Sequence, residues 1–223
     1  MQRLHNLLQQ SKIFGKFTEK QRQQLAALAI RRAIKRNESL LMQGEFWTNV
    51  LIISTGKLQS VISSLDGKSF VVSTWQKGDE FWPHTLFDGK PMPSTLEAAQ
   101  ESSIYQMDGE IVLKLLLSSP EAMRAFLHHM VTLIRKRRET ISDLAFQPVT
   151  GRLAKLLLTQ IPASEPSSTR DLTLPQIAAM VASSPEVVCR SLYQLQRFGL
   201  LQISRASITL QDRAGLERLV SSE

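Results

Sequence analysis

Residues 173–192 read TLPQIAAMVASSPEVVCRSL and contain two helix starts in close succession. Thr173 is followed three positions later by Gln176, the spacing of a capping box, and the proline between them suits the first turn of a helix. Ser184 and Pro185 form a second start, with a hydroxyl N-cap and a proline at the first helical position. The stretch therefore predicts two short helices separated by a tight turn, which is a helix–turn–helix.

The second of these helices is expected to run to Phe198, because Gly199 suits the left-handed residue that ends a helix. Apolar residues spaced four and then three apart predict its buried face: Val188, Leu192 and Leu195. The opposite face carries a mainly polar series with the same helical spacing: Glu186, Arg190, Tyr193 and Arg197.

Glu186 and Arg190 lie one turn apart near the start of this helix. Arginine can donate two hydrogen bonds to a guanine, and glutamate can accept one from the amino group of a cytosine. The pair therefore has the chemistry needed to read base edges in DNA. An ordinary solvated ion pair is the alternative interpretation, because most charged pairs at this helical spacing are of that kind.

Residues 176–192 resemble the CRP/FNR family of bacterial transcription regulators, in which this segment runs roughly qeIA…(G)xSxExVxRxL. The resemblance implies that Glu186 and Arg190 contact bases. Ala182 stands where the family usually has a glycine in the turn, which we expect to be tolerated if its φ angle stays negative. Pro185 replaces an additional base-contacting arginine of the catabolite-activator members, so their full operator preference is not expected. The Pro-Glu-x-x-Cys-Arg pattern is more similar to the FNR-like branch, which reads a TTGA-type half-site.

The composition is that of a folded globular chain, since 43% of the 223 residues are hydrophobic, and the length allows one large or two modest domains. A formal net charge of +7 suits a polyanionic partner. The single cysteine excludes a disulfide framework and a cysteine-rich metal or iron–sulfur site. No apolar run approaches the roughly 20 residues of a membrane span and the N-terminus has no signal-peptide core, so we expect a cytoplasmic protein.

From Arg31 to about Met107 the pattern changes to short β-rich runs. The clearest runs are residues 51–53, 58–62 and 70–75. Turns separate them at Gly44, Gly56, Gly67 and Gly78, and Asp66-Gly67 is a hairpin signal. Regular turns between short strands predict a β-barrel or jelly roll. The same spacing resembles the cyclic-nucleotide-binding-type sensor domain of the family, so the resemblance covers nearly the whole chain.

Cyclic-nucleotide binders of the family carry a phosphate cassette, approximately Phe-Gly-Glu-Leu followed by Arg-Ser/Thr-Ala. In those proteins the glycine backbone and the arginine hold the cyclic phosphate, and the glutamate holds the ribose hydroxyl. The corresponding segments here read Phe81-Trp82-Pro83-His84 and Pro93-Ser94-Thr95-Leu96, without the glycine, the glutamate or the arginine. A buried phosphate would lack its counter-charge, so we expect no binding of cAMP or cGMP in the family manner. An FNR-type oxygen sensor, which needs a set of cysteines, is excluded as well.

Aromatic and apolar residues gather in sequence around this segment. The candidate effector pocket is Trp75, Phe81, Trp82, His84 and Met92, and the alternative is that they fill the barrel. His84, or His128 and His129 on a later helix, are candidate haem ligands. A histidine without a fixed partner spacing is more often structural, however, and adjacent histidines on a helix point about 100° apart. We therefore expect no haem and no other cofactor, and an unidentified small-molecule effector stays open.

Residues 109–117 predict a short helix, and Pro120 opens a long one that ends near Phe146. Apolar positions spaced four and three apart along the long helix indicate a two-stranded parallel coiled coil. The predicted dimer interface is Met123, Leu127, Met130, Ile134, Arg137, Ile141 and Leu144, in which the arginine interrupts the apolar series. A helix packed only on its own barrel is the alternative. The family resemblance implies that this helix makes the homodimer, and a role in switching is a hypothesis.

Gln147-Pro148 marks a hinge, because proline cannot continue a helix and pushes the preceding residue out of the helical region. Residues 149–161 predict the first helix of a DNA-binding domain, residues 162–170 a polar loop, and the strands around residues 204–206 a β-hairpin wing. Residues expected to contact the DNA backbone or to support the reading helix are Ser183, Ser184, Pro185, Val187, Cys189, Arg197, Arg205 and Arg152.

The sequence thus predicts an α+β fold in three parts. Residues 1–108 would form a β-barrel or jelly-roll sensor domain of the cyclic-nucleotide-binding type, residues 109–146 a dimerisation helix, and residues 147–223 a winged helix–turn–helix domain. The predicted function is that of a homodimeric transcription regulator whose helix 185–198 enters the major groove of an inverted repeat in double-stranded DNA. RNA polymerase is an expected partner if the regulator is an activator.

Two other classes of function are weighed against this one. A ligand-sensing module that acts through protein–protein contacts without binding DNA is the alternative, which an intact winged helix disfavours. An enzyme is not expected, because no Ser/His/Asp, metal-ligand or phosphate-loop constellation is present. Cys189, near a helix start and beside an arginine, is a candidate redox switch, and a small residue packed near DNA is the alternative interpretation.

Overall fold

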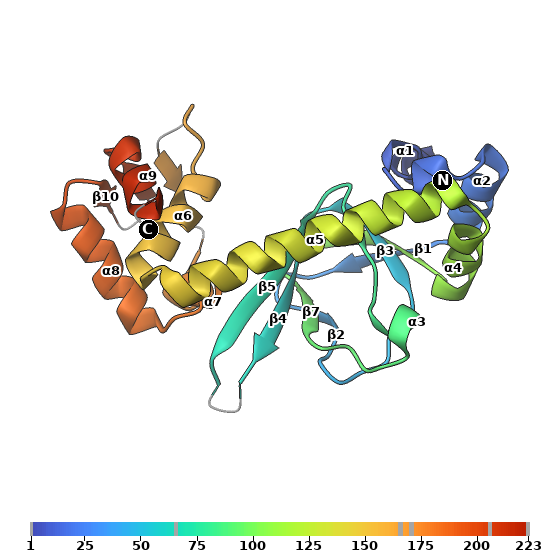
Figure 1. Ribbon diagram of the computed structural model, residues 1–223, viewed down its shortest axis with the longest axis horizontal. Helices are drawn as coiled ribbons and strands as arrows, with labels where there is room; N and C mark the ends of the chain where they lie inside the picture. Colours follow the sequence, from blue (N-terminus) through green and yellow to red (C-terminus); the bar gives the residue numbers. More distant parts are fainter. Residues whose placement is uncertain (1, 65–66, 165–166, 170–171, 205–206, 222–223) are drawn as a thin grey trace. The chain divides into compact units, whose positions relative to one another are not determined.

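The computed structural model describes residues 2–64, 67–164, 167–169, 172–204 and 207–221 (Figure 1). The chain forms two compact units, an N-terminal unit of Met1–Ile62 and Val72–Ile134 and a C-terminal unit of Ser63–Val71 and Arg135–Glu223. A β-rich N-terminal region, a long helix and a C-terminal helix–turn–helix follow one another along the chain. The predicted α+β fold class is therefore confirmed.

Helical segments precede the first strand of the N-terminal unit: α1 Gln2–Gln10, the 3-10 helix η1 Phe14–Lys16 and α2 Glu19–Leu28. A capping box starts α2. The Thr18 hydroxyl accepts a hydrogen bond from the Gln21 N–H at 3.3 Å, and the Gln21 amide oxygen accepts from the Thr18 N–H at 2.8 Å. Two N–H groups at the helix start, which have no partner within the helix, are satisfied in this way.

Two four-stranded sheets form the β-rich region, with strand orders β1-β8-β3-β6 and β2-β7-β4-β5. The first sheet consists of β1 Ile30–Ile34, β3 Val50–Thr55, β6 Glu80–Phe81 and β8 Ser102–Met107. The second consists of β2 Ser39–Leu41, β4 Lys57–Ser63, β5 Ser69–Gln76 and β7 Thr95–Ala98. Neighbouring strands in each order are often distant in sequence, as a rolled β-structure requires.

Strand β3 is buried on both faces, because its residues alternate between two cores. Val50 and Ile52 pack with the helices of the N-terminal unit, while Leu51 and Ile53 point into the interior between the two sheets. All four are at most 1% exposed. The continuous apolar run of this strand is thus explained by cover on both sides rather than by a solvent-facing edge.

Gly56 joins β3 to β4 in a conformation that suits only glycine. Its φ is +82°, and a Cβ at this position would lie 2.3 Å from the Glu101 carbonyl oxygen. The other turn glycines predicted from the sequence, Gly44, Gly67 and Gly78, also have positive φ angles. The predicted turns are therefore confirmed.

Three further helices complete this region. α3 Thr85–Asp88 follows β6, and α4 Gly109–Leu117 follows β8, where the Asp108 carboxylate caps the helix by accepting from the Ile111 N–H at 3.0 Å. α5 Pro120–Phe146 is the long helix, and its bounds agree with the prediction. Among the described residues, no helix combines the length and the apolar character that a membrane span requires.

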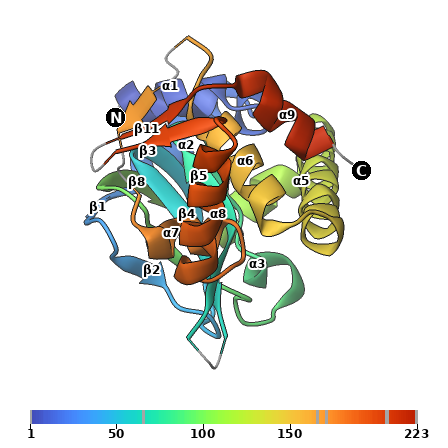
Figure 2. The same ribbon diagram turned by 90° about the vertical axis from the view of Figure 1, so that its left-hand side faces the viewer.

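The C-terminal unit contains a helical core and a small sheet, and Figure 2 faces it. Its helices are α6 Val149–Gln160, α7 Leu174–Met180, α8 Pro185–Arg197 and α9 Arg213–Ser221. The strands β9 Ser167–Thr169, β10 Leu201–Ile203 and β11 Ser207–Leu210 form an antiparallel sheet in the order β10-β11-β9. An apolar core joins the four helices with β10 and β11, and its members include Leu153, Leu157, Ile177, Val188, Leu192, Leu201, Ile208 and Leu216.

Strand β9 corrects the prediction that residues 162–170 form only a polar loop. Ser167 lies opposite Thr209 and Thr169 lies opposite Ser207 in an antiparallel pairing with β11. The segment Ser-Ser-Thr has no apolar alternation, which is the signal by which strands are recognised in a sequence. Its place in the sheet comes from backbone hydrogen bonds to β11, which leave no trace in the side-chain pattern.

Glu80, in β6, carries a carboxylate that is enclosed by the N-terminal unit. The Ser11 hydroxyl donates to one of its oxygens, and the Trp82 indole N–H donates to the other at 2.9 Å. Burial raises the pKa of Glu80 above its ordinary value, and these two hydrogen bonds oppose the rise while Asp79 adds to it. The carboxyl group therefore binds a proton more tightly in the folded than in the unfolded chain.

We expect Glu80→Gln to change how stability depends on pH. A raised pKa means that the folded state holds more protons than the unfolded state between the two pKa values, so stability falls as the pH rises through that window. The variant lacks this group. Its free energy of unfolding, relative to that of the wild type, should therefore increase as the pH rises above the ordinary pKa of glutamate. Denaturant unfolding followed by tryptophan fluorescence at a series of pH values measures this, because Trp47, Trp75 and Trp82 all lie in the N-terminal unit.

Glu101→Gln is the matched control, because Glu101 is exposed. The same substitution there removes no buried carboxyl group, so the comparison isolates the effect of burial at Glu80. A constant difference between Glu80→Gln and the wild type across the same pH range would contradict the assignment of a raised pKa to Glu80.

Candidate nucleic-acid interface

The first helix of the helix–turn–helix, α7, begins with the predicted capping box. The Gln176 amide oxygen accepts from the Thr173 N–H at 2.9 Å, and the Thr173 hydroxyl accepts from the Gln176 N–H at 3.4 Å. Pro175 lies in the first turn, where a missing N–H has no cost. Ile177 and Ala178 are buried and fix α7 on the core of the C-terminal unit.

The second helix, α8, starts and ends as predicted. The Ser184 hydroxyl accepts from the Val187 N–H at 3.4 Å, and Pro185 occupies the first turn. Phe198 is the C-cap, and Gly199 follows it with a φ of +70°. The start of α8 lies directly after the turn that joins the two helices, and α7 and α8 are in contact (Figure 2).

The two faces of α8 differ as the sequence predicts. Val188, Leu192 and Leu195 are at most 2% exposed and belong to the core of the C-terminal unit. The opposite face is exposed to solvent along its whole length: Glu186, Arg190, Tyr193 and Arg197. A helix held by one apolar face presents its other face in a fixed orientation, as insertion into a DNA groove requires.

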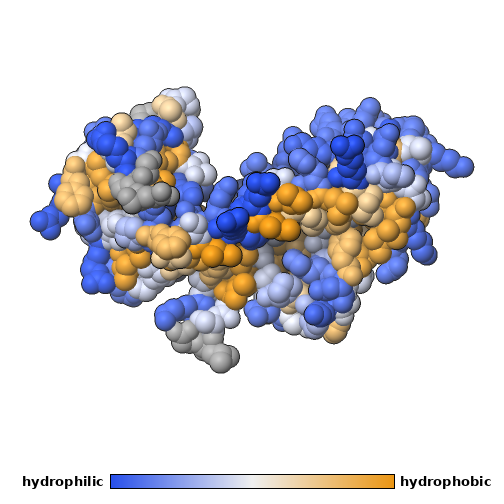
Figure 3. All heavy atoms as spheres, viewed as in Figure 1, coloured by the Kyte–Doolittle hydropathy of each residue, from blue (hydrophilic) through white to orange (hydrophobic). Residues whose placement is uncertain are grey.

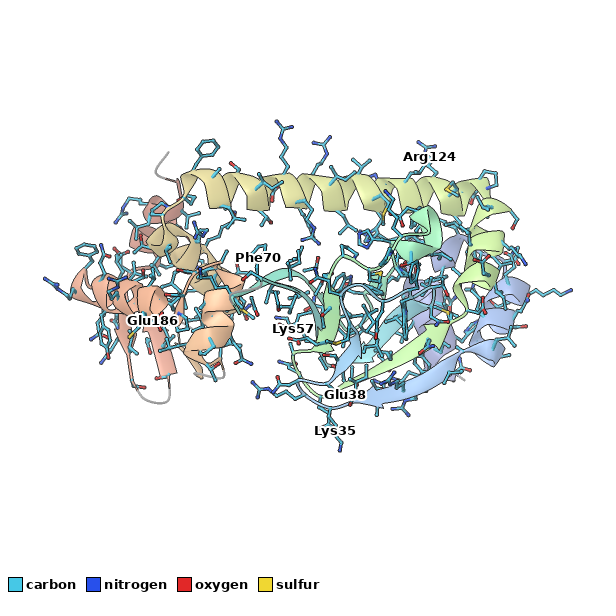
Figure 4. The ribbon with its side chains drawn as sticks, turned by 90° about the horizontal axis from the view of Figure 1, so that it is seen from below. Lys35, Glu38, Lys57, Phe70, Arg124 and Glu186 are labelled. Atoms are coloured by element: carbon cyan, nitrogen blue, oxygen red, sulfur yellow. The ribbon has the colours of Figure 1, made fainter. Side chains whose placement is uncertain are left out.

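Glu186 lies on the first turn of α8 and is fully exposed (Figure 4). The pKa of its carboxyl group is lowered, first by a hydrogen bond from the Ser184 hydroxyl, then by its own backbone N–H and by the charge of Arg190. The carboxylate is therefore ionised at neutral pH and can only accept hydrogen bonds. One turn further on, the Arg190 guanidinium can only donate them, so the two side chains are complementary to cytosine and guanine edges respectively.

The turn between the helices does not meet the condition under which an alanine was expected to be tolerated. Ala182 has a φ of +50°, whereas the expected tolerance required φ to stay negative. The Ser183 N–H donates to the Ala178 carbonyl at 2.9 Å, a pattern that closes the end of α7 and needs a left-handed residue between its two ends. An alanine held in this region costs roughly 1–2 kcal/mol. The short connection to α8 imposes this conformation, and the residue type alone did not reveal it.

Arg152, on α6, does not stand free for a phosphate. Its Nε donates to the Val181 carbonyl at 2.9 Å, Nη1 to the Gln147 carbonyl at 2.7 Å and Nη2 to the Ala182 carbonyl at 3.4 Å. Arg152 thus makes contacts within the C-terminal unit that suit a supporting role, and its contact with the DNA backbone stays a prediction. An arginine at this position looks the same in the sequence whether it faces solvent or backbone carbonyls.

The remaining predicted backbone-contacting or supporting residues have different surroundings. Arg197 is exposed, whereas Ser183, Ser184, Pro185, Val187 and Cys189 are partly buried around the start of α8. The thiol of Cys189 is free. Arg205 lies outside the described residues.

The predicted effector pocket is not formed as one cluster. Phe81 and Met92 are buried in the interior between the sheets, where Trp75 packs on Phe81 at a ring distance of 5.3 Å. Trp82 faces the other core and stacks on Phe14 at 5.4 Å. His84 is exposed. Phe81 and Trp82 are neighbours in the chain and point to opposite sides, which explains why closeness in sequence did not bring the five residues together.

The candidate haem ligands are also dispersed. Among the described residues, no group of three or more histidine, cysteine, aspartate or glutamate side chains is placed to hold a metal ion. His84 and His128 are exposed, and His129 is partly buried.

The long helix α5 presents an exposed apolar stripe, visible as orange side chains along it in Figure 3. Its exposed large apolar residues are Leu127, Val131, Ile134, Ile141, Leu144 and Phe146. Met123 and Met130, predicted at the dimer interface, are partly buried and pack against the helical core of the N-terminal unit, and Arg137 is partly buried; their place in a dimer stays a prediction. Val131 lies four residues after Leu127 and three before Ile134, so the spacing alone could not choose between it and Met130.

Known proteins share both parts of this structure. Residues 151–219 match the family model of the Crp-like helix-turn-helix domain, and residues 31–119 match that of the cyclic nucleotide-binding domain. The chain is 26% identical over 189 residues to the CRP-like cAMP-activated global transcriptional regulator of Mycobacterium tuberculosis, covering 82% of this chain and 84% of that protein. A β-roll of the cyclic-nucleotide-binding type joined to a DNA-binding helix–turn–helix defines the class of this protein as a transcription regulator.

Solved structures share the fold. A Crp/Fnr family protein of Eubacterium rectale has a TM-score of 0.78 at 21% identity, covering 94% of this chain and 97% of that one. The c-di-GMP responsive global regulator CLP of Xanthomonas campestris has a TM-score of 0.75 at 19% identity, covering 86% and 99%. The chain belongs to the CRP/FNR family of transcription regulators, which are not enzymes.

Proposed function

We propose that this regulator is a homodimer that binds an inverted repeat in double-stranded DNA through α8, without control by cAMP in the usual manner. Residues 1–108 act as the sensor, 109–146 as the dimerisation helix and 147–223 as the DNA-binding domain. The observation that carries the proposal is the exposed pair of Glu186 and Arg190 on a helix whose other face is fully buried. RNA polymerase is a partner if the regulator is an activator.

The charges of α8 favour a base-reading role over a solvated ion pair. The pKa of the Glu186 carboxyl group is lowered first by the Ser184 hydroxyl and its own N–H and only last by the charge of Arg190, so its ionisation does not depend mainly on Arg190. Arg190 is exposed, one turn along the same face. Arg197, two turns further, is suited to a phosphate, which fixes register without reading sequence.

Dimerisation is supported by the stripe on α5. Ile134 and Ile141 are 68% and 66% exposed, and Leu127 is 56% exposed. Exposed aliphatic residues at this regular spacing along a long helix are typical of a seam that a second helix covers. Two α8 helices related by the dimer axis would then enter successive major grooves about one turn of DNA apart.

Independence from cAMP is supported by what occupies the cassette segments. The buried Ser94 hydroxyl hydrogen-bonds the buried Ser60 hydroxyl at 2.5 Å, and the Trp82 ring is stacked on Phe14. Neither segment supplies a cation for a cyclic phosphate. The M. tuberculosis relative is cAMP-activated by name, whereas an effector of this protein, if it has one, must be recognised by other groups.

Arg190→Ala should weaken binding to a duplex with an inverted repeat of TTGA-type half-sites by about 1–3 kcal/mol per half-site, because one bidentate contact to guanine is lost in each half-site. Discrimination against a substitution at that guanine should disappear as well. Fluorescence anisotropy with matched and substituted duplexes measures both effects. Arg218→Ala, which removes the same charge from an exposed position of α9, is the control. Equal losses on cognate and scrambled DNA would refute base reading by Arg190.

Ile134→Asp should shift the protein from dimer to monomer, because a charge would be buried in the seam against its symmetry mate. Thr132→Asp introduces the same charge two residues away, about 160° around the helix, and should leave the dimer intact. Sedimentation velocity at micromolar concentration measures the oligomeric state. A wild-type monomer, or a dimer that Ile134→Asp does not weaken, would contradict the proposed interface.

Calorimetric titration of the wild type with cAMP should give no binding heat, and cAMP should leave the affinity for DNA unchanged. The physical reason is the absence of a cation and of a ribose-binding carboxylate in the cassette segments. A cAMP-dependent gain in DNA affinity would show that another group compensates the phosphate.

A further inference from the structure

We propose that Arg152 is a positioning residue for the DNA-reading helix: it holds the strained turn before α8 and ties that turn to the hinge residue Gln147. The inference rests on the proposed DNA-binding function of α8. It assigns to Arg152 a role in setting the direction of Glu186 and Arg190 rather than a contact with DNA.

The geometry joins three separate segments through one guanidinium group. Nε and Nη2, which share one edge of the group, donate to the consecutive carbonyls of Val181 and Ala182 at 2.9 and 3.4 Å. Nη1 donates to the carbonyl of Gln147 at 2.7 Å. Only the planar fork of arginine can reach two neighbouring carbonyls and a third group at the same time.

The turn needs such a partner because Ala182 has a φ of +50°, a region that alanine normally avoids. This conformation orients the carbonyls of Val181 and Ala182 towards Arg152. Ala182 lies two residues before Ser184, the N-cap of α8. Without the guanidinium, both carbonyls would lose a charged donor in a partly buried place. The alanine could then relax, and the start of α8 would move with it.

Gln147 is held from a second side. Its Nε2 donates to the carbonyl of Val220 at 3.1 Å, and a Cβ at Gly151 would lie 2.6 Å from its Oε1. Gln147, one of the two residues between α5 and α6, is therefore closely packed within the C-terminal unit. Its carbonyl accepts the hydrogen bond from Arg152. A movement of the Gln147 backbone would therefore be transmitted to the turn before α8 through the side chain of Arg152.

The test is a double-mutant cycle in the full-length protein with Arg152→Ala, Ala182→Gly and the double variant, together with Arg152→Lys. Lys155→Ala is the control, because Lys155 lies on the same helix but forms an ion pair with Asp143 at 2.6 Å. Two quantities are measured. One is the affinity for a cognate and a scrambled duplex, and the other is hydrogen exchange, without DNA, of the amides at the start of α8.

We expect Arg152→Ala to weaken cognate binding about tenfold and to speed amide exchange at the start of α8 by a similar factor, with little effect on scrambled DNA. Ala182→Gly should restore most of both losses, since glycine needs no help to hold a positive φ. Arg152→Lys should resemble Arg152→Ala, because an ammonium group cannot span both carbonyls. Lys155→Ala should leave exchange at the start of α8 unchanged.

Three outcomes overturn the proposal. Equal losses on cognate and scrambled DNA, with normal exchange, would make Arg152 a phosphate contact. Faster exchange throughout the C-terminal unit without rescue by Ala182→Gly would make its role purely structural. Normal amide exchange at the start of α8 in Arg152→Ala refutes the inference even if the protein binds DNA. Faster exchange that Ala182→Gly reverses, in a protein that binds no DNA, refutes only the proposed function.

Discussion

The structure of the DNA-binding part depends on the burial of one face of α8. Val188, Leu192 and Leu195 are enclosed by α6, α7 and the small sheet, and together they fix both the position and the rotation of the helix. The rotation about the helix axis matters most, because a rotation of about 100° would point a neighbouring face of α8 outwards in place of the charged face. The side chains proposed to read bases make no contribution to this anchoring, so they are free to serve recognition.

In the N-terminal unit, the first sheet is covered on both faces and contributes side chains to two separate cores. The alternation of Val50, Leu51, Ile52 and Ile53 between the helical core and the sheet interior is the consequence. Phe81 and Trp82, in the first cassette segment, also face these two cores, and each ring has packing partners there. A cyclic nucleotide-binding domain is thereby retained around two segments that contain no glycine, glutamate or arginine.

Much of the fold could be predicted because its signals are local. Capping at Thr173 and Ser184 and the proline that opens α5 each set a boundary through neighbours within one turn of helix. The features that the sequence did not reveal depend on distant partners. Strand β9 exists through pairing with β11, and Ala182 takes its positive φ through the closure of a short turn. The Arg152 carbonyl contacts join residues up to 30 positions apart, which periodicity cannot indicate.

The most direct test of the account is a selection of binding sites from random duplex DNA by the purified full-length protein, without added ligand. We expect enrichment of an inverted repeat whose half-sites are centred about 10 base pairs apart. A folded protein that enriches no sequence, or a site without two-fold symmetry, would contradict the claim that paired α8 helices read DNA.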